Sequence, residues 1–272
     1  MRSVAFSPKG PAYLAAARSD GFVKIVDLAY RREIAPAQHD GSAIDVAFSP
    51  DAKFVAAVWD KGDVAVWKIS GGQEIFHTNH PQSFTSVAFS PDGKYLATSS
   101  ADSNACLWDL KAGQLAWTYR HAGTVTSISF SPDGQHVATA SLDKTLRIWS
   151  TTSEAHLSSL TNKGTLLAIT FSPDGKYLAA DSGDEAKVWD WGTWTELVRL
   201  PHFRSVESVA FSPDGSLLAT AGGEGIVRLW LWRRDDLIRE AHRRVTRNLT
   251  PAEWIGYLGH TEPYHKTFLD LP

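Results

Sequence analysis

The sequence predicts an all-β fold of six similar units of antiparallel strands, with four strands in each complete unit, followed by a short α-helical C-terminal tail. Three observations support this. A segment of about 40 residues recurs six times, short apolar strands alternate with turn signals inside each copy, and the pattern becomes helical after Trp232. This period and strand content are typical of the blades of a β-propeller, which together form one domain.

Large residues at fixed positions define the repeat. A phenylalanine ends the first strand of each copy, at Phe6, Phe48, Phe89, Phe130, Phe171 and Phe211. A second large residue ends the third strand, at Val26, Trp67, Trp108, Trp149, Trp189 and Trp230. Neighbouring members of each series lie 40–42 residues apart. We therefore place a six-bladed propeller at residues 1–232, with copies near 1–38, 39–79, 80–120, 121–161, 162–201 and 202–232, and the tail at residues 233–272.

The segments between these large residues predict the strands and turns of one blade. The sequence SPDG at residues 131–134 predicts a tight turn after the first strand, because proline presets φ, aspartate bonds its own backbone and glycine accepts positive φ. Fourth strands are expected between copies, for example at residues 72–78, 113–120 and 195–201. After copy six the helical pattern follows at once, so we expect only three strands there.

Four polar and aromatic residues recur in copies three and four. They are His80, Thr98, Asp102 and Trp108, and then His121, Thr139, Asp143 and Trp149. With these residues, residues 1–232 resemble the WD-repeat family. The resemblance implies that each quartet forms a hydrogen-bonded chain inside its blade, which would satisfy a buried imidazole and a buried indole.

The other copies depart from this quartet. In copy two, Ala57 replaces the hydroxyl residue and Asp60 comes one position early. In copy five, Asn162 and Ala180 stand at the histidine and hydroxyl positions, and in copy six Glu224 replaces the aspartate. We therefore expect the whole quartet only in copies three and four.

The tail carries a second resemblance. Its matching residues are Arg247, Asn248, Leu249, Thr250, Glu253, Trp254, Tyr257, Leu258, Gly259, Pro263, Tyr264, Thr267, Leu271 and Pro272. With them it is similar to the tails of bacterial WD-repeat proteins, many of them STAND-type signalling ATPases. The apolar positions Leu237, Ala241 and Val245 predict a first helix, and Thr250 followed by Pro251 predicts the start of a second. We expect this tail to pack on the last blade, with Trp254 and Tyr257 as anchors, rather than to bind a ligand.

The two ends of the repeat array suggest an incomplete ring. The first residues already read as the first strand of a blade, and copy six lacks a fourth strand. Unpaired strand edges are usually avoided in natural proteins. We therefore expect the chain to be the C-terminal part of a larger protein that has lost upstream domains or repeats, or a truncated reading frame. In isolation it is expected to aggregate, dimerise or rearrange.

Composition narrows the classes of partner and compartment. The formal net charge of −3 provides no basic surface for nucleic acid. No apolar run approaches the length of a membrane span, and no secretory signal precedes the first strand. The one cysteine, Cys106, fits a reducing, cytoplasmic setting and is predicted to be a buried structural residue.

The sequence shows no motif of a known catalytic, cofactor or metal site. It contains no glycine-rich phosphate loop, no GxSxG segment, no paired cysteines and no HExxH segment. His77 and His80 are close in sequence, but one belongs to a strand and the other to a quartet, so we do not expect them to form a metal site. The prediction is a protein without catalytic residues, cofactor or metal.

Large side chains in the turns that carry the histidines and aspartates are the candidate partner-binding residues. They are Arg18, Trp59, Phe84, Lys163, Phe203 and Arg204. Loops on a rigid scaffold often bind partners, although scattered large surface residues are also common without any function. The sequence thus favours a protein-interaction or ligand-sensing scaffold, such as the sensor part of a bacterial signalling protein. The alternative is an enzyme with its site in the central channel, which converging acids or histidines with shifted pKa values would indicate.

Overall fold

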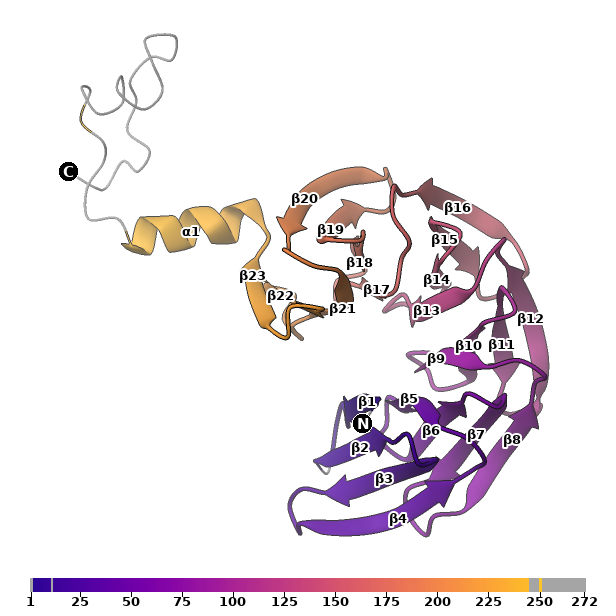
Figure 1. Ribbon diagram of the computed structural model, residues 1–272. Coiled ribbons are helices and arrows are strands. Elements are labelled where there is room, and N and C mark those ends of the chain that lie inside the picture. The colour runs from indigo at the N-terminus through magenta and orange to yellow at the C-terminus, as the bar shows by residue number, and fades with distance from the viewer. Residues whose placement is uncertain (1, 11, 245–249, 251–272) are drawn as a thin grey trace.

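The computed structural model describes residues 2–10, 12–244 and 250, which form six antiparallel sheets and one helix (Figure 1). Consecutive strands are neighbours in every sheet. The first sheet contains β1 (Ser3–Phe6), β2 (Tyr13–Ala17), β3 (Phe22–Asp27) and β4 (Arg32–Gln38). The second contains β5 (Ala43–Phe48), β6 (Phe54–Trp59), β7 (Asp63–Lys68) and β8 (Glu74–Asn79). The third contains β9 (Phe84–Phe89), β10 (Tyr95–Ser100), β11 (Asn104–Asp109) and β12 (Gln114–Arg120).

The remaining sheets follow the same order up to the last, which has three strands. The fourth contains β13 (Val125–Phe130), β14 (His136–Ser141), β15 (Thr145–Ser150) and β16 (His156–Thr161). The fifth contains β17 (Ile169–Phe171), β18 (Tyr177–Asp181), β19 (Glu185–Asp190) and β20 (Thr195–Pro201). The sixth contains β21 (Val206–Phe211), β22 (Leu217–Gly222) and β23 (Val227–Leu231). The expected change to helix follows directly, as α1 (Arg234–Arg244).

The sheets are arranged along an arc. The first strands of successive sheets contact one another along its inner side, and the fourth strands form its outer side (Figure 1). The first and last sheets lie at the two ends of the arc, apart from each other. Each inner sheet therefore packs between two neighbours, whereas each end sheet has a neighbour on one side.

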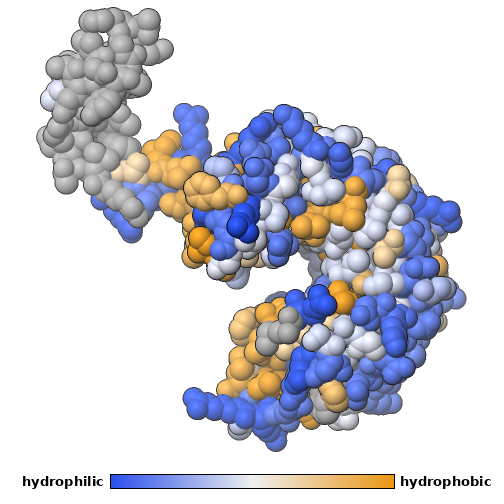
Figure 2. Space-filling model, in the orientation of Figure 1, coloured by the Kyte–Doolittle hydropathy of each residue, from blue (hydrophilic) through white to orange (hydrophobic). Residues whose placement is uncertain are grey.

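This difference is visible in the exposure of apolar side chains. On β15, in the fourth sheet, Leu146 and Ile148 are fully buried. Phe6 on β1 and Leu229 on β23 are 69% and 68% exposed. Figure 2 shows hydrophobic residues gathered at both ends of the arc. The packing of one blade thus depends on the next, as expected for a repeat array.

The turn that follows the first strand has the predicted local bonds in copies two to six. In copy four, the Ser131 hydroxyl donates to Asp133 over 2.5 Å, and the Asp133 carboxylate accepts from the Gln135 N–H over 3.0 Å. Gly134 has φ 71°. In copy two, Ala52 occupies this glycine position at φ 55°. The turn conformation is therefore kept there by a residue that is less suited to it.

The end of the chain is only partly described. Trp232 is buried and its indole N–H donates to the Gly215 carbonyl over 3.1 Å, which fixes the start of α1 to the last sheet. Leu237 and Ile238 on α1 are 47% and 45% exposed, so the predicted apolar face of this helix is not buried against the described residues. Val245, the predicted second helix, and the anchors Trp254 and Tyr257 lie outside the described residues.

Candidate functional site

Copy four contains a continuous hydrogen-bonded chain across its blade. His121 Nδ1 lies 3.0 Å from Asp143 Oδ2, His121 Nε2 lies 2.7 Å from Thr139 Oγ1, and the Trp149 indole N–H donates to Thr139 Oγ1 over 2.9 Å. Because an ionised carboxylate only accepts, Nδ1 donates to Asp143 and Nε2 accepts from the threonine hydroxyl. This is the arrangement that the family resemblance implies for the quartet.

The environment of this chain shifts two pKa values. Burial of the His121 imidazole, opposed by the Asp143 charge, lowers its pKa to about 4. For Asp143, burial opposes ionisation, but hydrogen bonds from Thr145 and Ala122 outweigh it and hold the pKa of the carboxyl well below its usual range. The pair is therefore a neutral imidazole beside a carboxylate, and it links strands rather than presenting a reactive group.

Copy three keeps only part of its predicted quartet. The Trp108 indole N–H donates to Thr98 over 2.9 Å, as in copy four. His80, however, directs Nε2 toward Asp102 Oδ2 at 3.4 Å instead of toward the threonine. The Asn104 amide already donates to that same oxygen over 2.8 Å, so His80 approaches an acceptor that is already engaged. The prediction of a complete chain in copy three is thus corrected.

Copy six forms the part of the chain for which it has the residues. His202 Nε2 lies 2.9 Å from Thr220 Oγ1, which also accepts from the Trp230 indole over 2.8 Å. Glu224, in the place of the aspartate, forms an ion pair with Arg228 at 2.6 Å and accepts from the Phe203 N–H. The longer acid is thereby directed to the loop before β21, and it holds the backbone of that loop.

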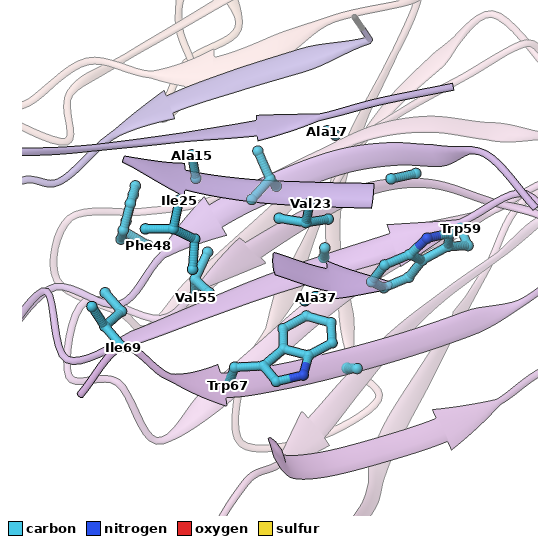
Figure 3. Close-up of a cluster of buried hydrophobic side chains, with 14 residues drawn as sticks. Ala15, Ala17, Val23, Ile25, Ala37, Phe48, Val55, Trp59, Trp67 and Ile69 are labelled. Carbon is cyan, nitrogen blue, oxygen red and sulfur yellow. The ribbon is translucent and has the colours of Figure 1, made fainter. Parts of the chain in front are cut away.

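Two of the six candidate partner-binding residues are buried. Trp59 is the last residue of β6, is fully buried, and donates its indole N–H to the Gly21 carbonyl over 2.9 Å (Figure 3). Phe84 is the first residue of β9 and is 1% exposed. Both are corrected to core residues. Each side chain packs against residues of a neighbouring sheet instead of standing in a loop.

The other four candidates lie at the surface. Phe203 is 91% exposed, with Arg204 exposed beside it. Lys163 is exposed next to Asn162, whose side-chain oxygen accepts from the Lys163 N–H over 2.9 Å. Arg18 is partly exposed and forms an ion pair with Asp20. These four residues come from copies one, five and six, and the described contacts do not bring them together into one cluster.

Two further groups bear on a channel enzyme. The Cys106 thiol is buried, and this burial raises its pKa to about 12, so it does not supply a thiolate at neutral pH. Burial also raises the pKa of the Asp181 carboxyl to about 6. Asp181 Oδ1 accepts from the N–H groups of Leu167 and Ala168 over 2.7 and 2.8 Å, where the first strand of copy five is shortened. The Asp181 carboxylate thus caps two backbone N–H groups that the shortened strand leaves without a strand partner.

Copy two places its histidine differently from copies three, four and six. Because Ala57 has no hydroxyl, His39 has no partner at the threonine position, and its Nε2 lies 3.1 Å from Glu74 Oε2. The His39 ring stands 4.7 Å from the ring of His77 on β8. Sequence reasoning missed this grouping, although the loss of the hydroxyl at Ala57 was a signal that His39 needed another partner.

No helix among the described residues is long and apolar enough to cross a membrane.

A protein-family model described as "WD domain, G-beta repeat" matches residues 73–109, 113–150, 153–190 and 194–230, together more than half of the chain. Each match begins near a fourth strand and ends with the third strand of the following sheet. A search of curated proteins found no match to this chain. The matched segments end at residue 230, so the resemblance of the tail to signalling ATPases remains a prediction. The repeats and the six antiparallel sheets agree, and the chain belongs to the WD-repeat family, whose domains serve as protein-interaction scaffolds.

Proposed function

We propose that this chain is a non-catalytic protein-interaction scaffold whose partner binds the face that carries the histidine and aspartate turns, at copy six. The observation that supports this is the exposed Phe203, at 91%, in a loop of fixed conformation. Its backbone N–H is bonded to Glu224, and the Arg228 guanidinium lies over its ring, 5.8 Å from the centroid. A large aromatic side chain is thus held in water by a rigid frame.

Such a group has the properties of a binding anchor. Aromatic and arginine residues dominate the energetics of protein interfaces, and Arg204 follows Phe203 directly. Because Glu224 already fixes the backbone, binding would lose less conformational entropy than it would with a mobile loop. Lys163 comes from the neighbouring copy five and is assigned to the edge of this surface, where charges contribute little affinity. Arg18 belongs to copy one, at the other end of the arc, and is paired with Asp20, so it is not assigned to this surface.

The geometry supports the scaffold over an enzyme in the channel. The groups with strongly shifted pKa values include His121 and Asp181, and each is engaged in bonds of its own blade. They belong to different copies and different hydrogen-bond sets. A catalytic site would need an acid, a base and a substrate position within reach of one another.

The tail resemblance supports a finer proposal on context. We assign the scaffold to a bacterial cytoplasmic signalling protein, in which residues 1–232 form the propeller and sense a partner while residues 233–272 form a helical tail. This assignment rests on the tail residues from Arg247 to Pro272, and on Cys106 as the one cysteine. A test of this assignment requires a known partner, so the binding surface has to be tested before it.

The test compares two aromatic residues on opposite faces. Tyr30 is 75% exposed with Arg32 over its ring at 5.4 Å, but it lies in the turn after β3, at the other end of the strands from Phe203. The wild-type chain and the variants Phe203→Ala, Arg204→Ala and Tyr30→Ala would be crosslinked in lysate of the source cells. We expect one protein to be captured by wild type and Tyr30→Ala, weakly by Arg204→Ala and not by Phe203→Ala. Equal capture by Phe203→Ala would contradict the proposed surface.

A further inference from the structure

Four potential metal ligands meet on the second sheet. His39, Asp63 and His77 each offer one donor atom, and these atoms all lie within 4.8 Å of one another, the one such group of three within residues 2–10, 12–244 and 250. His77 Nε2 is 3.0 Å from Asp63 Oδ1. Glu74 adds a fourth donor, with Oε2 3.1 Å from His39 Nε2. The residues come from the loop before β5, from the start of β7 and from β8.

Two alanines make room for this group. Ala57 pairs with Ala65 in the second sheet, where Thr139 pairs with Arg147 in the fourth. In copy four the hydroxyl binds the histidine, and Arg147 lies 3.6 Å from Asp143. Copy two has neither the hydroxyl nor the cation. Its histidine turns outward to β8, where His39 lies beside Glu74 and His77 lies beside Asp63. The Asn79 amide also donates to Asp63 Oδ1, over 3.0 Å.

The group combines a fixed inner part with an adjustable outer part. The side chains of His39 and Asp63 are only 17% and 13% exposed, and the His39 ring packs against the indoles of Trp59 and Trp67 at 4.8 and 5.7 Å. Glu74 and His77 are 38% and 41% exposed. They lie on the outermost strand of the sheet, where an ion can enter from water.

We propose that copy two binds a divalent transition-metal ion of the zinc type through His39, Asp63 and His77, with Glu74 as the fourth ligand. Two imidazoles with carboxylates suit zinc and related ions, whereas calcium and magnesium prefer oxygen ligands alone. With metal–ligand bonds of about 2.0–2.2 Å, the donors of a tetrahedral site lie roughly 3.3–3.5 Å apart. The exposed His77 and Glu74 side chains have to move inward to reach this spacing.

The experiment is a titration of the untagged full chain with Zn²⁺ in competition with a chromogenic chelator. We expect one equivalent to bind, and binding to weaken at least tenfold in His77→Ala and in Asp63→Asn. The matched control is His156→Ala, because His156 is also an exposed histidine on the outermost strand of its sheet and packs beside Trp149 at 5.1 Å. This control should bind Zn²⁺ like wild type.

Co²⁺ provides a second readout that a purely structural role would not change. Bound in a tetrahedral site with nitrogen and oxygen ligands, it should give the strong visible absorption of that geometry in wild type and in His156→Ala, but not in His77→Ala. Saturating Zn²⁺ should also raise the melting temperature of wild type and leave that of His77→Ala unchanged. If His77→Ala does not fold, His77→Asn takes its place.

Two results would overturn the proposal. One is a wild-type chain that binds Zn²⁺ no more tightly than the His39→Ala/His77→Ala double variant, in which case the four residues form only a hydrogen-bonded cluster. The other is an equal loss of binding in His156→Ala, which would assign the affinity to scattered surface histidines. Neither result depends on the partner surface at Phe203, so the two proposals fail or hold separately.

Discussion

Copies two and four have the same strand order, but their sheets are held together differently. In copy four a polar chain runs from Asp143 through His121 and Thr139 to Trp149. In copy two an alanine interrupts that chain, and the buried Trp59 and Trp67 pack against each other at 5.6 Å with His39 above them. One blade is stabilised by a satisfied polar network and the other by aromatic packing. The same fold thus leaves the histidine of copy two available for other chemistry.

The largest expected effect of a substitution is at Trp149. This side chain is 5% exposed, stacks on Tyr119 with ring centroids 5.0 Å apart, and donates to Thr139. We expect Trp149→Ala to lower the free energy of unfolding by about 3–5 kcal/mol, as the loss of a large buried aromatic does. Urea denaturation would measure it, and an unchanged midpoint would show that the quartet does not stabilise this blade.

Substitutions to phenylalanine separate the hydrogen bond from the packing. Trp149→Phe removes the donor to Thr139, whereas at Trp67 the matching position holds Ala57 and offers no hydroxyl. We expect Trp149→Phe to cost about 1 kcal/mol more than Trp67→Phe, the usual net value of one hydrogen bond. Equal costs would mean that packing alone decides the stability of both blades.

The repeat and its strands could be predicted well from the sequence, because they depend on periodic local signals. The phenylalanines at the ends of the first strands, the SPDG turns and the change to helix after Trp232 place the sheets along the chain. The three-stranded last sheet follows from the same pattern. The phenylalanines repeat in every copy and the SPDG turn repeats in copies three to six, so these copies support the reading of one another.

Individual side chains could not be placed as well, because their partners come from other strands. Trp59 was expected in a loop on the face that carries the histidine and aspartate turns, yet it fills the core beneath His39. Phe84 could have been recognised as a core residue. Its matching positions in other copies are apolar and buried, at Ala43, Val125, Leu166 and Val206. The approach of His77 to Asp63 depends on a pairing across strands, whereas the engagement of Asp102 by Asn104 is a contact between residues two positions apart in one turn.

An effect nearly as large as that expected at Trp149 is a dependence of stability on pH that arises in copy four. Burial lowers the pKa of His121 from 6.5 to about 4 in the folded chain. Between these values the unfolded chain binds more protons, so the free energy of unfolding rises with pH through this window and falls on acidification. The contribution is on the order of 3 kcal/mol. The lowered pKa of Asp143 acts separately, through stability that is lost as the pH falls below its ordinary value of 3.8.

Denaturation of wild type and His121→Gln at several pH values between 4 and 7 would test this. The variant should be less stable at pH 7, and its stability should change less across the window than that of wild type. Parallel curves for the two proteins would show that other groups cause the pH dependence, and that the His121 imidazole is not desolvated in the folded chain.

The smallest expected effect is in the turns, where opposite substitutions can be made in copies two and four. Ala52 in copy two and Gly134 in copy four occupy the same turn position, at φ 55° and 71°. A side chain at Gly134 would meet only ordinary contacts, the nearest being Pro91 Cδ at 3.5 Å, so backbone strain is the main term there. Left-handed backbone costs a non-glycine residue about 1–2 kcal/mol, partly offset by the greater freedom of glycine in the unfolded chain. We therefore expect Ala52→Gly to stabilise and Gly134→Ala to destabilise the chain, each by about 0.5–1 kcal/mol in urea denaturation. Ala52→Gly could instead lower the stability of the chain. The methyl group of Ala52, which is 6% exposed, would then contribute more by packing than it costs in backbone strain. Copy two would in that case depend on apolar contacts in its turn as it does in its core.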